Sequence, residues 1–491
     1  MRACGVLLPV SSLPSKYGIG AFSKEAYDFV DRLCQAGQRY WQILPLGPTG
    51  YGDSPYQSFS TFAGNPYFID LEQLIADGLL TREQCEACDF GWDPSCIDYG
   101  KLYRERYPLL RLAFSHDTQS QAALTDFRQT HQGWLEDYAL YMAVKEDFDG
   151  RCWSDWPENI RNRRPEAMEL YRVQLADTVD FYVWLQYQFD RQWRRLKDYA
   201  NERGILIIGD LPIYVAFDSA DTWASPELFQ FDDNNEPLAV AGCPPDGFAA
   251  DGQLWGNPLY RWDYHRDTDY AWWVRRIRHS LQLYDVVRID HFRGFDEYYS
   301  IPYGAVTARG GHWEPGPGMD FFDSVKKQIS HLPVIAEDLG YLTPSVMELV
   351  KNTGFPGMKI IEFAFDSRES GNYMPYTYEK NCVVYTGTHD NQTLKGWLEE
   401  MDGADRALAF DYLNLKQAPE DLYKYFIRLA LSSVADTAMI PMQDYLGLGP
   451  EARLNTPSTL GNNWCWRLEP GQFTQNLAIE MRGLAKVYGR L

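Results

Sequence analysis

Three acidic residues stand at the ends of three apolar runs, and this pattern is the one in the chain best suited to catalysis. The acids are Asp290 after 286–289, Glu337 after 334–336, and Asp390 after 383–389. Successive intervals of roughly fifty residues match one βα unit with an enlarged loop. If the runs are parallel strands, all three carboxyl groups meet at the same end of the sheet.

Arg288 and Asp290 lie two residues apart in an apolar, β-branched run. On a strand they share one face, while Val287 and Ile289 point to the other. The cation favours the charged form of the carboxylate, and an ionised carboxylate at the end of a buried strand can act as a covalent nucleophile. A simple strand-end ion pair is the alternative interpretation.

Two carboxyl groups could cleave a glycosidic bond with retention, which requires a separation of about 5–5.5 Å between attacking group and proton donor. Desolvation by the apolar run 334–336 would raise the pKa of the donor. Asp338 follows Glu337 directly and points to the opposite face, so the sequence leaves open which of the two is the acid. Asp390 could hold sugar hydroxyls, with His389 as a hydrogen-bond donor. Capping of the following helices is the alternative for all three acids.

Eight apolar runs are predicted strands, and helical patterns separate most of them: 4–8, 40–46, 204–212, 285–290, 333–337, 358–363, 382–386 and 438–442. Buried strands that alternate with helices indicate a parallel sheet of the α/β class. Eight such strands predict a (β/α)8 TIM barrel, whose active site lies at the C-terminal rim. We expect the long connections to form that rim: 47–56, 214–262, 292–318 and 443–466.

The interval between the second and third predicted strands is too long for one crossover. Amphipathic helices are expected there at 99–114, 124–144 and 180–202. The aromatic stripe of the last helix is interpreted as core packing. We therefore predict a single catalytic barrel over 1–491, with a helical insertion subdomain at 65–175.

The composition limits the classes of partner. Asp and Glu total 68 against 46 Lys and Arg, a net charge of −22, which argues against nucleic acid and against a membrane surface. The 16 Trp and 33 Tyr offer flat faces for sugar rings. Nine scattered cysteines, without a secretory or membrane-spanning run, predict a cytoplasmic protein. Cys85 and Cys88 lack the further ligands that zinc would need, so we interpret this pair as incidental.

Nine short motifs are spread over nearly the whole chain: SPYQS at 54–58, GNPY at 64–67, GDLPIYV at 209–215, PPD at 244–246, WGNPLY at 255–260, RIDHFRG at 288–294, AEDLG at 336–340, GTHDN at 387–391 and NWCWR at 463–467. Together, and in this order, they resemble the amylomaltase or disproportionating-enzyme family, the 4-α-glucanotransferases allied to the α-amylase superfamily. The resemblance implies a retaining transglycosylase that moves α-1,4-glucan segments to the 4-OH of another glucan or of glucose.

That resemblance also implies the residue roles, with a covalent glucosyl intermediate and with no metal and no organic cofactor. Asp290 would be the nucleophile, Glu337 the general acid/base and Asp390 the transition-state stabiliser. The substrate-binding residues would be Tyr56, Asp210, Trp255, Arg288, His291, His389, Asn463 and Phe248. Gly247 departs from the family pattern, because a bulkier aromatic residue is expected there.

Several alternatives stay open from the sequence. The chain could be an α-amylase-like hydrolase with the same three acids, or a non-catalytic glycan-binding protein. Trp255 could simply fill a loop, His291 could be a satisfied strand-end histidine, and Asp210 could cap the helix that follows it.

Overall fold

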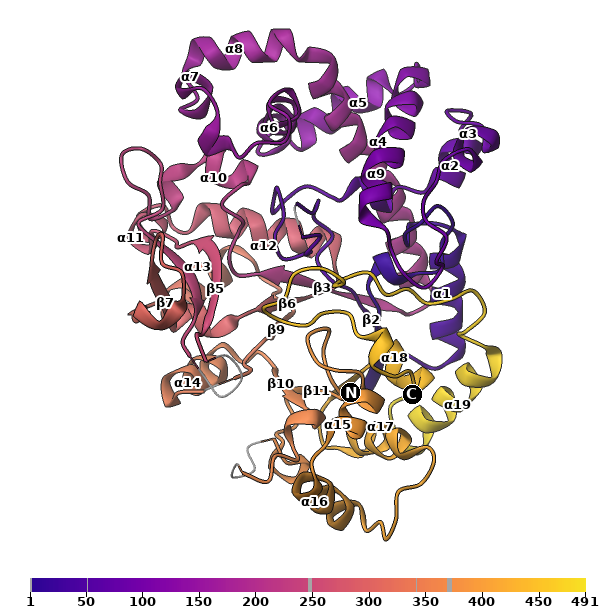
Figure 1. The fold of residues 1–491 in the computed structure, drawn as a ribbon. Coiled ribbons are helices and arrows are strands. Elements are labelled where there is room, and N and C mark those ends of the chain that lie inside the picture. The colour runs from indigo at the N-terminus through magenta and orange to yellow at the C-terminus, as the bar shows by residue number, and fades with distance from the viewer. Residues whose placement is uncertain (1, 51, 246–249, 341, 369–372) are drawn as a thin grey trace.

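Eight parallel strands form a barrel at the centre of this computed structural model, which describes residues 2–50, 52–245, 250–340, 342–368 and 373–491 (Figure 1). In sheet order they are β10 (Gly357–Ile360), β11 (Cys382–Tyr385), β12 (Thr437–Pro441), β1 (Ala3–Leu7), β2 (Tyr40–Gln42), β3 (Leu206–Pro212), β6 (Val286–Asp290) and β9 (Val334–Ala336). The Ala336 amide donates to the Pro356 carbonyl at 2.9 Å and thereby links β9 to β10 across the remaining gap. The predicted (β/α)8 barrel is confirmed.

The observed strands are shorter than several of the predicted ones. The run 40–46 is a strand only over β2, and 358–363 leaves the strand after Ile360 for a single turn of 3-10 helix, Ile361–Phe363. Apolar residues continue past both strand ends because the polypeptide is still buried where it turns onto the rim. Hydrophobicity alone therefore places the strands but not their ends.

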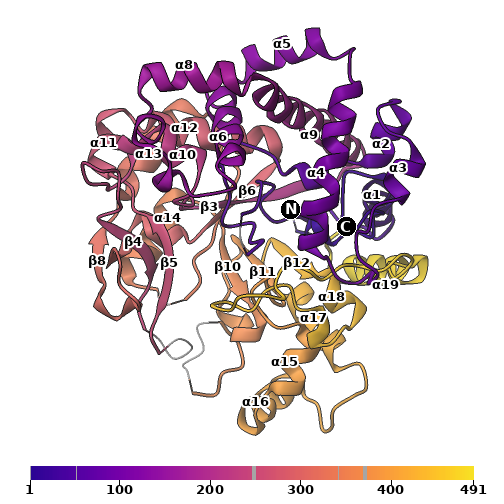
Figure 2. The ribbon, with the colours of Figure 1, turned by 45° about the horizontal axis from the view of Figure 1, so that its top comes forward.

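Helices fill the long interval between β2 and β3 (Figure 2). They are α2 (Leu71–Ala76), α3 (Arg82–Glu86), α4 (Tyr99–His116), α5 (Gln121–Thr130), α6 (Leu135–Asp147), α7 (Glu158–Arg161), α8 (Pro165–Gln174) and α9 (Ala176–Glu202). The prediction of one helix over 124–144 is wrong, because a turn at 131–134 that contains Gly133 separates α5 from α6. The aromatic stripe of α9 is buried as expected. The limits of a subdomain at 65–175 stay a prediction.

A second, antiparallel sheet lies beside the barrel and consists of β5 (Gln253–Pro258), β4 (Ala239–Cys243), β7 (Glu297–Pro302) and β8 (His312–Pro315) in that order. Its strands belong to the connections 214–262 and 292–318, in which no strand was predicted. The pairing of β4 with β7 joins residues about sixty positions apart, and it forms only once the barrel brings both connections together.

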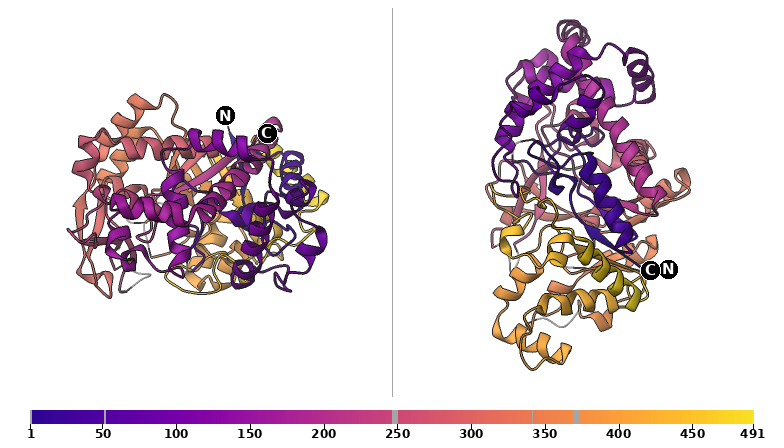
Figure 3. Two further views of the ribbon diagram at one scale, coloured as in Figure 1. Left: turned by 90° about the horizontal axis from the view of Figure 1, so that it is seen from above. Right: turned by 90° about the vertical axis from the view of Figure 1, so that its right-hand side faces the viewer.

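The remaining helices surround the barrel: α1 (Lys24–Gln35), α10 (Ala220–Ala224), α11 (Trp262–Asp267), α12 (Ala271–Leu283), α13 (Gly318–Gln328), α14 (Pro344–Thr353), α15 (Leu394–Glu400), α16 (Gly403–Leu413), α17 (Leu422–Ser432), α18 (Met442–Leu446) and α19 (Gln475–Val487). The two chain ends lie side by side (Figure 3), where the guanidinium of Arg490 donates to the Ala3 carbonyl at 2.8 Å. Within the described ranges, none of the helices has the length and apolarity of a membrane span.

Candidate active site

Two of the three predicted acids are neighbours at the C-terminal rim of the barrel. Asp290 is the last residue of β6, and Glu337 directly follows β9. Ile289 pairs with Ala336 across these parallel strands, so Asp290 and Glu337 take the next position in the same register. Adjacent strands lie about 4.8 Å apart, so the backbones of Asp290 and Glu337 are separated by about that distance.

Arg288 points to the same side of β6 as Asp290 and joins two carboxylates. Its Nη2 lies 2.9 Å from Oδ1 of Asp290, and its Nη1 donates to both oxygens of Asp210 at 2.8 and 2.7 Å. The pKa of Asp290 is raised by burial, and the charge of Arg288 opposes that rise. The predicted pair on one strand face is therefore present, although burial outweighs the cation in its effect on the pKa.

Glu337 is held by backbone amides around the rim. Its Oε2 accepts from the His291 amide at 2.6 Å and its Oε1 from the Leu339 amide at 2.9 Å. Burial and then the charge of Asp290 raise the pKa of Glu337. Asp290 has the direct contact with Arg288, so it is the member of the pair that ionises first, and Glu337 is the one that holds its proton to higher pH.

Asp338 points away from this pair toward β10. Its Oδ1 accepts from the Met358 amide at 2.6 Å, and it packs so closely on Gly357 that an added Cβ there would lie 2.5 Å from Oδ2. Of the two adjacent acids that the sequence could not separate, Glu337 is the one on the side of Asp290.

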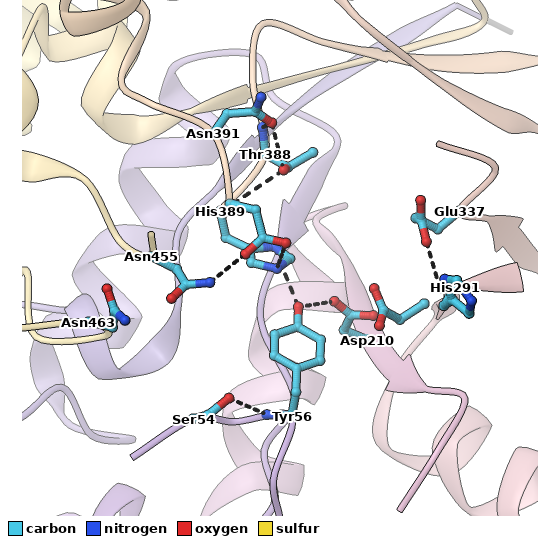
Figure 4. A network of polar contacts seen from close by, with 12 residues as sticks. Ser54, Tyr56, Asp210, His291, Glu337, Thr388, His389, Asn391, Asn455 and Asn463 are labelled. Atoms are coloured by element: carbon cyan, nitrogen blue, oxygen red, sulfur yellow. Dashed lines mark hydrogen bonds and ion pairs between the residues drawn. The ribbon is translucent and has the colours of Figure 1, made fainter. Parts of the chain in front are cut away.

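Asp390 lies in the turn that follows β11, beside His389 and the loop after α18. Its Oδ2 is 3.4 Å from Nε2 of His389, and its Oδ1 accepts from Nδ2 of Asn455 at 2.7 Å (Figure 4). Burial favours a higher pKa for Asp390, but His389 and Asn455 lower it to about 2. This acid is therefore ionised throughout the neutral range, unlike Glu337.

Asn455 and Arg453 are site residues that the sequence did not identify. The guanidinium of Arg453 donates to the backbone carbonyl of Asp390 at 2.8 Å. Both residues belong to the predicted rim loop 443–466. The length of this loop was the feature of the sequence that could have pointed to them. No periodicity within that loop could tell which of its side chains reach the acids.

Tyr56 connects the two halves of the site (Figure 4). Its hydroxyl donates to Oδ2 of Asp210 at 2.7 Å, and its ring stacks on that of His389 with centroids 5.1 Å apart and planes 20° apart. An aromatic face beside two acids suits the apolar face of a sugar ring. Asp210 is the partner of Arg288 and Tyr56 rather than a helix cap, since Ser219 caps α10.

Trp255 and His291 contact each other edge to face, with centroids 4.8 Å apart. Trp255 is half-buried on β5, and the histidine that it contacts is the residue that follows Asp290. His291 adopts a left-handed conformation with φ of 52°. Burial lowers the pKa of His291 to about 3, and its Nε2 has no hydrogen-bond partner within the described chain. It is therefore a neutral ring and not a satisfied strand-end histidine.

Of the last two predicted binding residues, Asn463 makes its side-chain hydrogen bonds within its own loop, and Phe248 cannot be placed. Asn463 lies beyond Asn455, and its side chain binds Thr456 and Thr459 of its own loop (Figure 4). Phe248 lies outside the described residues, as does Gly247. In the parts of the chain that the structure covers, no group of three or more His, Cys, Asp or Glu is arranged to hold a metal ion.

Capping does not explain the three acids. Thr343 caps α14 after Glu337, and Thr393 caps α15 after Asp390. The segment after Asp290 is a 3-10 turn, Phe292–Phe295, preceded by His291. The charge of Asp390 acts on the pKa of Asp290, and the charge of Asp290 acts on the pKa of Glu337, so the three acids lie near one another at the rim.

The comparison with known proteins agrees with this geometry. A family model described as 4-alpha-glucanotransferase matches residues 8–474. A 4-alpha-glucanotransferase of Clostridium butyricum is 50% identical over 485 residues, which cover 98% of this chain and 99% of the relative, and one of Thermus thermophilus is 44% identical over 100% and 99%. The structure of amylomaltase from Streptococcus agalactiae in complex with acarbose matches with a TM-score of 0.97 at 42% identity, over 100% of both chains. The chain belongs to the 4-alpha-glucanotransferase family of enzymes.

Proposed function

We propose that Asp290, Glu337 and Asp390 transfer α-1,4-glucan segments from a donor maltooligosaccharide to the 4-OH of a second glucan or of glucose, with retention at the anomeric carbon. The observation that carries this proposal is the paired register of Asp290 and Glu337 on β6 and β9, with Arg288 on one carboxylate only. Retention needs two close carboxyls of unequal proton affinity, and this arrangement supplies them.

In the first step, a carboxylate oxygen of Asp290 attacks the anomeric carbon and forms an ester bond. The bond from that carbon to the glycosidic oxygen breaks, and Glu337 gives its proton to the departing oxygen. In the second step, Glu337 takes the proton of the acceptor 4-OH as this oxygen attacks the same carbon. The ester bond breaks, and Asp290 returns to a free carboxylate.

Asp390 and His389 would bind hydroxyls of the sugar at the donor subsite and stabilise positive charge that develops on its ring. The low pKa of Asp390 supports this role, because the carboxylate stays charged while Glu337 is protonated. Tyr56 would lie against the face of the same sugar, with Asp210 on its hydroxyl. Trp255 and His291 would receive the acceptor, and Asn463 and Phe248 would border the groove.

Transfer prevails over hydrolysis if a sugar acceptor displaces water from the covalent intermediate. The edge-to-face pair of Trp255 and His291, next to Asp290, supports an acceptor surface that a sugar would occupy well. We also infer a cytoplasmic location, on the ground that the nine cysteines are scattered along the sequence without the spacing of a disulfide framework. The acidic net charge supports neutral glucans, rather than nucleic acid or membranes, as the partners.

Incubation of the purified protein with maltotriose tests the proposal. A transferase yields free glucose together with maltooligosaccharides longer than the substrate, while the total number of reducing ends stays constant. A steady rise in reducing ends would identify an α-amylase-like hydrolase instead. Absence of any new product would favour a glycan-binding protein.

A further inference from the structure

Two buried carboxyl groups lie behind the turn that carries His389 and Asp390, and the steps above use neither of them. Glu362 follows β10 and is 7% exposed, and Asp444 lies in α18 and is 2% exposed. Acids are seldom buried to this extent without partners, because desolvation of the charged form is costly. Their contacts with the turn therefore indicate what they do.

Asp444 accepts hydrogen bonds from both ends of the segment 386–394, which contains the turn. Its Oδ2 accepts from the Thr386 hydroxyl, and its Oδ1 accepts from the Leu394 amide at 2.8 Å. Both carboxylate oxygens thus have donors, which suits an ionised group.

Glu362 contacts the turn itself. Its carboxyl group lies close enough to the side-chain amide of Asn391 for that amide to oppose the rise in its pKa, and its backbone amide donates to the Thr386 carbonyl at 3.2 Å. Its Oε1 lies so close to Gly387 that an added Cβ there would be 2.8 Å away. A side chain at Gly387 would therefore push the carboxyl group of Glu362 aside.

Asn391 connects Glu362 to the turn that carries His389 and Asp390. Its Oδ1 accepts from the Thr388 amide at 2.9 Å and from the Thr388 hydroxyl at 2.8 Å (Figure 4). These two bonds close the turn around His389 and Asp390. The Thr388 hydroxyl in turn accepts from the Asp390 amide at 3.3 Å, so Glu362 is connected to Asp390 through the side chains of Asn391 and Thr388.

The surroundings of Glu362 favour its neutral form. Oε1 is buried and has no hydrogen-bond partner among the described residues, and the charge of Asp444 is nearby. A carboxylate with one bare oxygen beside a second carboxylate is far more costly to bury than the uncharged acid. Burial, and then the charge of Asp444, hold the pKa of Glu362 well above its usual range.

We propose that Glu362, as an uncharged carboxylic acid, is a positioning residue that holds Asn391 and so sets the place of Asp390 and His389 at the donor subsite. This inference rests on the proposed function of the same site. Asp390 would act most strongly on the charged transition state, so its displacement lowers kcat more than it raises KM.

Kinetics of maltotriose disproportionation by Glu362→Ala and Glu362→Gln test this role. We expect Glu362→Ala to lower kcat by about 10- to 100-fold with little change in KM, because small misplacements of a reacting group have effects of that order. Glu362→Gln, which is uncharged and of the same shape, should restore most of the wild-type kcat and leave the pH profile unmoved. Asn391→Ala should lower kcat in the same way, and the double variant should be no worse than Asn391→Ala.

Asp221→Ala is the matched control, because Asp221 is a buried acid that accepts from the Thr61 amide at 2.8 Å outside the turn. It should lower thermal stability without lowering kcat. Wild-type kcat in Glu362→Ala, or equal losses in the Gln and Ala variants, would overturn the inference. If Glu362→Ala does not fold, wild-type kcat in Asn391→Ala would overturn it as well. Wild type and Asp290→Asn are assayed in parallel, so that failure of the proposed function can be told from failure of this inference. An inactive wild type refutes the proposed function. An active wild type together with an unaffected Glu362→Ala refutes only the inference about Glu362.

Discussion

Nη2 of Arg288 lies 2.9 Å from Oδ1 of Asp290 on one face of β6, and its Nη1 donates to both carboxylate oxygens of Asp210 on β3. One buried cation therefore serves two carboxylates, and Glu337 receives no direct bond from it. This asymmetry makes Asp290 ionise at lower pH than Glu337, which is the division that retaining glycosyl transfer requires.

Asp290→Asn should abolish transfer. An amide cannot form the glycosyl ester, so we expect kcat to fall by about 10⁴-fold or more, as for other covalent nucleophiles. Product analysis with maltotriose measures the loss, and a thermal melt checks that the variant is folded. Appreciable turnover by the folded variant would rule out Asp290 as the nucleophile.

Activity should have a bell-shaped pH dependence. Asp290 must be ionised, so activity falls as the pH drops through its pKa, and Glu337 must be protonated, so activity falls as the pH rises through its own raised pKa. Glu337→Gln should lose the alkaline limb when assayed with a glucosyl fluoride donor, whose leaving group needs no proton. Asp338→Asn is the control, because Asp338 faces β10, and it should keep the full bell.

Removal of Arg288, the cation that Asp290 and Asp210 share, should shift the acidic limb of the pH profile. Arg288 lowers the pKa of Asp290, so in Arg288→Gln that pKa rises further and the acidic limb of kcat/KM shifts to higher pH. Two unpaired buried carboxylates should also lower the free energy of unfolding by about 3–5 kcal/mol. Arg106→Gln, at a buried arginine that binds the carbonyls of Tyr17 and Ile69, should destabilise the protein and leave the limb in place.

The two functions of Tyr56 can be separated by substitution. Tyr56→Phe loses the hydrogen bond to Asp210 but keeps the ring, so kcat/KM should fall by about 3- to 10-fold. Tyr56→Ala also loses the stacked ring, and its KM for maltotriose should rise in addition. Tyr141→Phe, on α6, removes a comparable bond to Asp218 and should leave kcat/KM unchanged. Equal kinetics for the Phe and Ala variants would exclude a role of the ring in binding.

The sequence by itself determined the barrel and the rim on which its acids stand. Apolar runs of strand length, repeated eight times between helical patterns, can be buried together in few ways, and parallel strands bring their C-terminal ends to one mouth. The period of two along 286–290 was enough to place Arg288 beside Asp290.

Only the tertiary structure decided which residues complete the site. Glu337 and Asp338 are equivalent in local pattern, and they differ because one meets the His291 amide and the other the Met358 amide. The bond from Asn455 to Asp390 spans 65 positions, and the antiparallel sheet likewise joins separate connections. Local sequence encodes periodicity and turn preference, whereas contacts of this kind depend on where distant segments pack, and so they become defined only when the barrel closes.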